Sequence, residues 1–386
     1  MNVLHIDFLQ LLTTIVVLIV SFLICLKLGV AFFRLSTKRV IKLFLWHFIF
    51  CLIYIFYVTN VGGDANGYFS RANAGLVNFN VGTRFVDWLT SILINLNLSF
   101  VGVFFFFNCL GTIGLLAFDS TLKSIPSHSK KFTSLKTFLP FLPSISFWSA
   151  GLGKDAISFL AISLAIWSIT RLRKKNSILV ISIIIMLLVR PHIAAIMVVA
   201  LCTSIAFERG VKLPIKVLVL LISLLGTSLI LPFALKYSGV SSYGGLNSES
   251  IQTYIDKRQS YNLEGGSSVN IDSMSLPMQM FTYLFRPFPF EARSITSLFA
   301  SLDNMVLFMI IIIGLKSIFH KNLKYDFANR KFLWVYSLLT LVILSMTTAN
   351  LGIAMRQKWM FVPVIMYLFL SAISVSKIRR NSKSTL

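Results

Sequence analysis

Residues 100–116 read FVGVFFFFNCLGTIGLL, a run that contains no charged side chain. Comparable runs occupy residues 15–26 (IVVLIVSFLICL) and 305–315 (MVLFMIIIIGL), and two more lie at 217–235 and 332–346. Each run can be extended to the roughly 20 residues that a helix needs to cross about 30 Å of hydrocarbon. The sequence therefore predicts an all-α polytopic membrane protein.

The composition agrees with this prediction. Of the 386 residues, 56% are hydrophobic and 13% are charged, and the mean hydropathy is +0.82. A soluble domain has about a quarter of its residues charged, which argues against a soluble fold. The net charge of +23 comes from short basic clusters between the apolar runs, as in cytoplasmic loops. We therefore expect membrane lipid around the chain and no nucleic-acid partner.

The basic clusters orient the chain in the membrane. Most of the 36 Lys and Arg residues fall in six segments, namely 27–42, 123–136, 171–175, 209–216, 316–331 and 377–383. If all six are cytoplasmic, the helices between them come in pairs, the amino terminus is outside and the carboxyl terminus is inside. This predicts a single integral membrane domain over 1–386, with about eleven transmembrane helices. They are expected at 6–26, 43–61, 100–118, 137–152, 155–170, 177–191, 193–207, 214–235, 296–315, 332–350 and 358–376.

Three segments depart from a simple membrane-spanning pattern. Residues 84–98 form a short segment that contains the charged Asp87, and this predicts an interfacial or re-entrant helix at the outer surface. The span at 137–152 contains two prolines, so we expect it to be bent or to cross only half of the bilayer. Residues 237–279 are polar and rich in Ser, Gly and Asn, which predicts a large outer, periplasmic loop.

No metal or cofactor site is expected. The four cysteines all lie inside apolar segments and have neither metal-ligand nor disulfide spacing: Cys25, Cys51, Cys109 and Cys202. The sequence has no cluster of carboxylates with metal spacing and no glycine-rich nucleotide-binding loop.

The basic residues outside the six clusters fall at the predicted outer ends of the helices or in the predicted outer loops. Five motifs at these places hold several of these basic residues, carboxylates and a histidine: Gly62-Gly-Asp64-Ala-Asn66-Gly-Tyr68, Phe147-Trp148-Ser-Ala-Gly-Leu-Gly-Lys154-Asp155, Arg190-Pro191-His192, Phe285-Arg286-Pro-Phe-Pro-Phe-Glu291 and Asn350-Leu-Gly-Ile-Ala-Met-Arg356-Gln-Lys358. Ionisable groups within a membrane cost about 2.5–3.5 kcal/mol each, so they usually mark a pathway or a site. Several arginines at one membrane face suit a diphosphate, which a guanidinium binds through paired hydrogen bonds.

Each of these residues also has a plainer interpretation. A lone arginine near a helix end often anchors the helix to the lipid headgroups, and an aspartate beside glycines often belongs to a turn. Lys154 and Asp155 can form an ion pair within a tight turn, and Glu291 can serve only to pair with Arg286 or Arg293. His192 can be an interior polar residue satisfied by hydrogen bonding, or a proton acceptor.

In their order and spacing, the five motifs resemble the Wzy-type repeat-unit polymerases of bacterial O-antigen and capsular polysaccharide. The resemblance implies a lipid-dependent, GT-C-like glycosyltransferase that is a multi-pass protein of the bacterial inner membrane. The implied substrates are undecaprenyl-diphosphate-linked oligosaccharides, which the enzyme joins at the outer face of the membrane. A chain-length regulator and a flippase of the same pathway are implied partners.

The reaction implied by the resemblance assigns roles to the motif residues. The leaving group is a lipid diphosphate, whose developing charge suits the basic side chains. The predicted substrate-binding residues are Lys154, Arg190, Arg286, Arg356 and Lys358. The acceptor hydroxyl needs a base; the predicted catalytic residues are Asp64 and His192 first, then Asp155 and Glu291.

Two other functions stay open at this point. The O-antigen ligase that transfers polysaccharide onto lipid A core is expected to use a similar set of arginines and a long outer loop. A flippase for lipid-linked oligosaccharides would need charged residues through the whole depth of the membrane, whereas here they gather at one end of the helices. A purely structural membrane subunit, with no catalytic role, would have no use for five charged outer segments.

The predicted orientation can be tested by labelling single cysteines in intact cells. Gly62→Cys and Ser268→Cys should react with a membrane-impermeant thiol reagent, because both positions are predicted to face outward. Ser177→Cys should react only after the cells are permeabilised. Reaction of the Ser177→Cys variant in intact cells would overturn the orientation of the whole chain.

Overall fold

The structure of the chain is a computed structural model that describes residues 7–75, 77–171, 176–207, 212–214, 216–217, 221, 267–271, 273–319 and 330–383. Within these ranges the chain is helical and has no β-strand apart from one isolated bridge between Ser268 and Asn350. The chain divides into two compact units. Unit 1 comprises residues 1–124 and 134–190, and unit 2 comprises residues 125–133 and 191–386.

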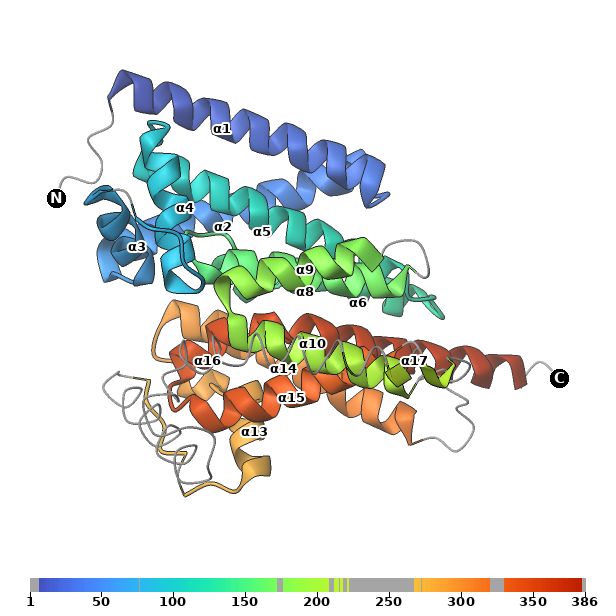
Figure 1. Cartoon of the computed structure of the whole chain (residues 1–386). Helices are drawn as coiled ribbons and strands as arrows, with labels where there is room; N and C mark the ends of the chain where they lie inside the picture. Colours follow the sequence, from blue (N-terminus) through green and yellow to red (C-terminus); the bar gives the residue numbers. More distant parts are fainter. Residues whose placement is uncertain are drawn as a thin grey trace. The chain divides into compact units, whose positions relative to one another are not determined.

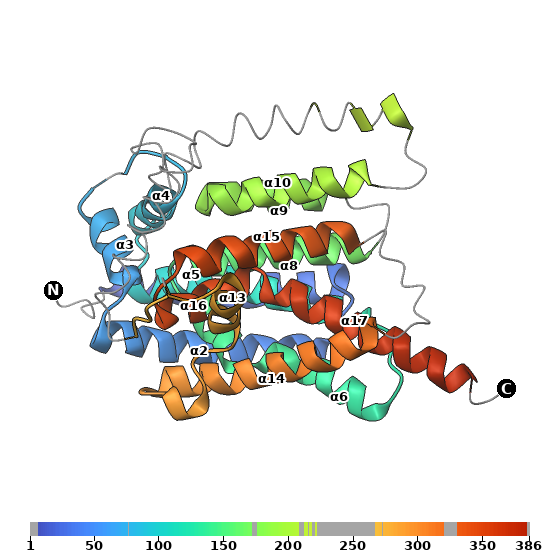
Figure 2. The same ribbon diagram turned by 90° about the horizontal axis from the view of Figure 1, so that it is seen from below.

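Unit 1 contains the amino-terminal helices (Figures 1 and 2). They are α1 (Phe8–Lys27), the π-helix Leu28–Phe32, α2 (Thr37–Val61), α3 (Asp64–Asn73), α4 (Thr83–Asn95), α5 (Phe100–Lys123), the end of α6 (Lys130–Phe138), the 3₁₀ turn Leu139–Phe141, α7 (Pro143–Ser149), α8 (Lys154–Thr170) and α9 (Asn176–Val189). Several of these helices begin at a polar cap. Asp7 accepts a hydrogen bond from Gln10 N, and Ser99 accepts one from Gly102 N, which satisfies backbone N–H groups that the first helical turn leaves unpaired.

Helix α5 is the centre of unit 1, and α1 lies at its periphery. In the most apolar stretch of α5, 78% of the residues are buried, against 17% in α1. The outer surface of α1 exposes large apolar side chains, such as Ile19 at 53% and Leu23 at 55%. An apolar surface of this kind is unfavourable in water and favourable against lipid tails. The exposure of α1 is thus compatible with a membrane protein.

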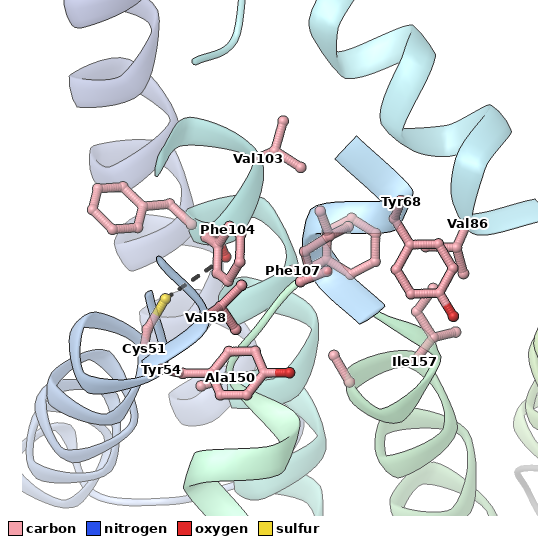
Figure 3. Close-up of a cluster of buried hydrophobic side chains, with 14 of the residues drawn as sticks. Cys51, Tyr54, Val58, Tyr68, Val86, Val103, Phe104, Phe107, Ala150 and Ile157 are labelled. Atoms are coloured by element: carbon pink, nitrogen blue, oxygen red, sulfur yellow. Dashed lines mark hydrogen bonds between the residues drawn. The ribbon is translucent and has the colours of Figure 1, made fainter. Parts of the chain in front are cut away.

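The core of unit 1 is built by aromatic and aliphatic side chains from seven helices, and Figure 3 shows part of it. Tyr54 and Val58 of α2 lie against Phe104 and Phe107 of α5, while α3, α4 and α8 supply further apolar contacts. The Cys51 thiol makes a 3.8 Å contact with the carbonyl oxygen of Phe104. This core holds the short helices α3 and α4 against the long ones, and so fixes the loops that carry the candidate residues.

A buried charge network occupies the end of unit 1 that is predicted to be cytoplasmic. Asp119 of α5 is 1% exposed and pairs with Arg39 of α2 at 2.6 Å and with Lys123 at 3.2 Å. The Arg171 guanidinium donates to the Ser120 hydroxyl over 2.7 Å. Arg39, Lys123 and Arg171 belong to three of the basic clusters, so the structure brings those clusters together at one end of the helices.

Unit 2 contains the carboxyl-terminal helices (Figure 1). They are α10 (Pro191–Ala206), α13 (Leu276–Phe285), the 3₁₀ turn Pro289–Glu291, α14 (Ile295–Ile318), α15 (Lys331–Thr347), α16 (Leu351–Gln357), the 3₁₀ turn Lys358–Met360 and α17 (Val362–Lys383). Helix α10 packs along α15, and α14 packs along α17. Large apolar side chains of α14 are exposed, including Met309 at 60%, as in α1.

A short backbone pairing closes one end of unit 2. Val269 N donates to Ala349 O over 2.9 Å, and Leu351 N donates to Ser267 O over 2.9 Å. Asn350, between them, caps α16 through hydrogen bonds to its side chain from Gly352 N and Ile353 N. The end of the polar segment predicted as an outer loop is therefore attached to the connection between α15 and α16.

Most of the predicted spans overlap described helices, but only four or five of the spans are supported by the length and composition of those helices. Every predicted span except 214–235 overlaps a described helix. By length and apolar composition, four described helices can each cross a membrane: Phe8–Phe32, Thr37–Val61, Phe100–Lys123 and Ile295–Ile318. The pair Leu351–Met360 and Val362–Lys377, bent by 61°, adds a fifth if it counts as one span. A count of about eleven stays a prediction.

Two predicted segments lie largely outside the described residues, and two others can be examined. The span at 214–235 and the loop at 237–279 are described at only a few positions. Residues 137–152 are broken by their prolines into the end of α6, a 3₁₀ turn and α7, because a proline interrupts the helical hydrogen bonds. Helix α4 has 13 residues and extends about 20 Å, less than the hydrocarbon thickness. Its predicted interfacial or re-entrant placement stays a prediction, as does the single integral membrane domain over 1–386.

Helices α5 and α7 approach each other so closely at Gly111 that no side chain fits there. A Cβ atom added at Gly111 would lie 2.0 Å from the carbonyl oxygen of Ser149 and 2.7 Å from His47 Cε1. Gly111→Ala should therefore push the helices apart and destabilise unit 1 by about 1–3 kcal/mol. Gly153→Ala is the control, because its Cβ would meet only Tyr68 at 3.9 Å. The melting temperatures of the Gly111→Ala and Gly153→Ala variants in detergent check this prediction. Equal melting temperatures would contradict the close approach of the helices at Gly111.

Candidate functional site

In unit 1, the first candidate residue, Asp64, follows a break between two helices. Helix α2 ends at Gly62, and the backbone at Gly62 and Gly63 has φ angles of +90° and +151°. Both values lie in a region that favours glycine. The turn allows Asp64 to open α3, where its negative charge interacts favourably with the helix dipole. Asp64 is exposed, as a residue that meets a substrate must be.

Helices α3 and α4 are joined by an ion pair. Arg71 of α3 binds the Asp87 carboxylate through Nε and Nη2, at 3.0 and 2.9 Å. Asp87 is 1% exposed, whereas the Arg71 side chain is 49% exposed. The hydrogen bond to Asp87 raises the pKa of Arg71, and Asp64 contributes to the same effect through its charge. Asp64 thus lies within the electrostatic influence of Arg71.

Lys154 and Asp155 begin α8 and have different partners. Lys154 donates to the Thr83 hydroxyl at the start of α4, over 3.2 Å. Asp155 pairs with Arg190, just beyond the end of α9, at 2.5 Å. A lysine in the first turn of a helix is disfavoured by the helix dipole, so stabilisation of α8 does not explain Lys154.

Arg190 is enclosed by the protein. It is 5% exposed, and its Nε donates to the Ser158 hydroxyl over 3.2 Å. A second contact, from Gly82 N to Leu188 O at 2.7 Å, joins the start of α4 to the end of α9. The predicted outer residues of unit 1 therefore gather at one end of its helices, opposite the Arg39–Asp119 network.

In unit 2, Arg286 and Glu291 form a paired contact on the connection between α13 and α14. Nε and Nη2 of Arg286 donate to Glu291 Oε1 over 2.9 and 2.6 Å, and Phe288 N donates to Oε2 over 2.8 Å. Partial burial opposes ionisation of Glu291, but these hydrogen bonds and the charge of Arg286 outweigh it and lower its pKa. The Arg286 side chain is 28% exposed, so the pair is open to solvent.

Lys358 lies in the interior of unit 2. It is 1% exposed, and its ammonium donates to Asn304 Oδ1 on α14. The Asn304 amide donates in turn to the carbonyl oxygens of Phe285 and Pro287, at 3.1 and 3.2 Å. Lys358 is therefore connected, through one side chain, to the backbone on both sides of Arg286.

The two remaining predicted residues of unit 2 are partly accessible. Arg356 lies in α16 and His192 in the first turn of α10, and both are half-buried. With Arg286, Glu291 and Lys358, they are the candidate residues that this unit holds.

Sequence reasoning missed several residues that hold these groups. Asp87 was noted only as an obstacle to a membrane span, yet it is the partner of Arg71. Asp303 and Asn304 lie within the apolar segment of α14, are 3% and 2% exposed, and were not selected. An adjacent acid and amide inside an apolar run is the signal that would have found them.

No protein-family model matches the chain, and the curated proteins and solved structures contain no significant match to it. Among the residues that the structure describes, no three His, Cys, Asp or Glu side chains are grouped so that they could hold a metal ion. The functional assignment therefore depends on the geometry of the site and on the motifs.

The Arg286–Glu291 pair predicts how stability depends on pH. A carboxylate whose pKa is lower in the folded than in the unfolded state stabilises the fold above its unfolded pKa of about 4.3. This contribution is lost as the pH falls through the lower, folded-state value. Wild type should therefore melt at a higher temperature than Glu291→Gln at pH 7, and the difference should shrink as the pH falls below about 4.3 and disappear below the lower folded-state pKa. Melting curves from pH 3 to 7 check this, and a constant difference would contradict the ion pair.

Proposed function

We propose that this chain polymerises undecaprenyl-diphosphate-linked oligosaccharide repeat units into surface polysaccharide. It would work at the outer face of a bacterial inner membrane, as a protein of about eleven spans with GT-C-like architecture. The observation that carries the proposal is the solvent-accessible Arg286–Glu291 pair on a connection between apolar helices of unit 2. The motifs in the sequence support the rest of the assignment.

The reaction requires one bond to form and one to break. The hydroxyl at the non-reducing end of a fresh lipid-linked unit attacks the anomeric carbon of the growing chain. The bond from that carbon to the lipid diphosphate breaks, and the diphosphate leaves with the bonding electron pair. A base accepts the hydroxyl proton. Cations stabilise the charge that develops on the diphosphate oxygens.

Arg286 and Arg190 differ in how far their side chains are exposed to solvent. Glu291 engages Nε and Nη2 of Arg286, and the planar, five-donor guanidinium has further N–H groups for a second ligand. At 28% exposure, the Arg286 side chain can meet a diphosphate from solvent. The Arg190 side chain is 6% exposed and is paired with Asp155. Arg286 is thus the better diphosphate ligand, and Arg190 and Asp155 support the loop that carries them.

The lowered pKa of Glu291 changes its proposed role. A carboxylate with a depressed pKa holds protons weakly and is a poor general base at neutral pH. Glu291 therefore orients Arg286, and the proposed proton acceptor in unit 2 is His192, while the catalytic role of Asp64 stays a prediction from the sequence. His192 is half-buried, so it is accessible to a hydroxyl. Arg356, which belongs to the same unit as Arg286, completes the proposed cationic set of unit 2.

The surface polysaccharide of a strain that lacks this chain, complemented with Arg286 variants, tests the proposal. Arg286→Ala should collapse the ladder of chain lengths to core bearing one repeat unit, as in the uncomplemented strain. Arg286→Lys should keep a fraction of the ladder, because lysine retains the charge but not the paired hydrogen bonds. Loss of one charged contact in the transition state is expected to reduce the rate about 10²–10³-fold.

Arg293→Ala is the matched control for these variants. Arg293 lies on the same connection and is exposed, so its loss should leave the ladder intact. A normal ladder with Arg286→Ala would remove Arg286 from the site. In the strain without the chain, loss of all surface polysaccharide with lipid-linked units trapped inside would indicate a flippase instead. Fully polymerised chains left on their carrier lipid would indicate a ligase.

A further inference from the structure

Asn304 is the link between a buried charge and the loop that carries Arg286. It lies on α14, is 2% exposed, and its amide nitrogen donates to two backbone carbonyls, those of Phe285 and Pro287. These carbonyls belong to the residues directly before and after Arg286. Both ends of this short backbone segment are thus held by the same side chain.

The orientation of the Asn304 amide is determined by Lys358. An ammonium group can only donate hydrogen bonds, and an asparagine side chain has a donor end and an acceptor end. Since Lys358 donates to Asn304 Oδ1, the NH₂ group of Asn304 must point the other way, toward the carbonyls. Without the lysine, the amide can rotate and place its oxygen against the carbonyls of Phe285 and Pro287.

The burial of Lys358 needs an explanation, because an ammonium removed from water is costly unless it is partnered. Lys358 is among the largest fully buried side chains of the described residues. The buried carboxylate of Asp303, next to Asn304 on α14, interacts with it electrostatically. Simple adhesion between helices does not require a lysine at this point, because smaller neutral polar groups serve in membrane interfaces.

We propose that Asn304 and Lys358 are a positioning pair that fixes the backbone on both sides of Arg286 and so aims its guanidinium. This assigns Lys358 a role different from the substrate contact that the sequence predicted. The kinetic part of the inference rests on the proposed polymerase function. The positioning part does not, because it concerns the loop alone.

Hydrogen–deuterium exchange on the purified full chain tests the positioning part. Asn304→Asp keeps an oxygen for Lys358 but places a carboxylate oxygen against the two carbonyls. Lys358→Met removes the ammonium that orients the amide. Both variants should increase exchange of the Phe288 and Glu291 amides about tenfold, the effect expected for loss of one or two hydrogen bonds.

Ser301→Ala is the matched control. Ser301 is buried on the same helix and donates only to Leu298 O, within α14, so exchange in the loop should not change. If the Asn304 and Lys358 variants fold and exchange like the control, the positioning pair is overturned. If Lys358→Met fails to fold, Asn304→Asp, which retains the lysine's partner, decides the matter.

The kinetic part is measured with lipid-linked repeat units as substrate. Asn304→Asp should lower kcat/KM on the order of 100-fold, mainly through kcat, since the aimed arginine stabilises charge that develops during the reaction. Adding Arg286→Ala to Asn304→Asp should cost little more, because both changes remove the same interaction. If the effects of Asn304→Asp and Arg286→Ala on kcat/KM were fully additive, Asn304 would not act through Arg286 and the inference would be overturned. If the Asn304 and Lys358 variants show faster loop exchange but the wild-type chain has no polymerase activity, the polymerase function is rejected and the positioning pair stands.

Discussion

The pairing of charged side chains among apolar helices is the constraint on which the described structure depends. Removing an ion from water costs several kcal/mol even after the protein relaxes, so a lone buried charge is not tolerated. Asp119 meets two cations at one end of unit 1, and Asp155 meets Arg190 at the other. The Arg39–Asp119 pair joins α2 to α5, and the Asp155–Arg190 pair joins α8 to the end of α9, whereas Lys123 lies one turn from Asp119 on α5 itself. The charges therefore fix which helix ends lie together, while the apolar side chains supply most of the stabilisation.

The same constraint explains which parts of the fold the sequence predicts well. A segment such as 100–118 has one favourable environment, and α5 follows it closely. The grouping of basic clusters is likewise predictable, because Arg39, Lys123 and Arg171 were expected on one side and are found at one end of unit 1. Residues 137–152 were harder, since hydropathy favours one helix whereas the prolines divide it into three pieces.

The candidate site was predictable in its residue types but not in its pairing. Arg190 was considered with His192, two positions away, yet its carboxylate partner Asp155 is on another helix. Arg286 and Glu291 are five residues apart, and this local pairing was among the alternatives that the sequence offered. Asn304 illustrates the limit. Its function depends on two backbone carbonyls and a lysine 54 residues away, and no pattern in a single sequence contains that information.

A carboxylate partner is compatible with a diphosphate-binding arginine. A guanidinium that must bind an anion and later release it needs a stable arrangement for the interval when the anion is absent. Glu291 provides one: it neutralises Arg286 and holds its plane through two hydrogen bonds. A diphosphate carries more negative charge than one carboxylate. It can therefore bind the N–H groups of Arg286 that Glu291 leaves unused, while Glu291 stays in place. In the proposed reaction, the arginine would then meet the diphosphate already oriented, and less conformational entropy would be lost on binding.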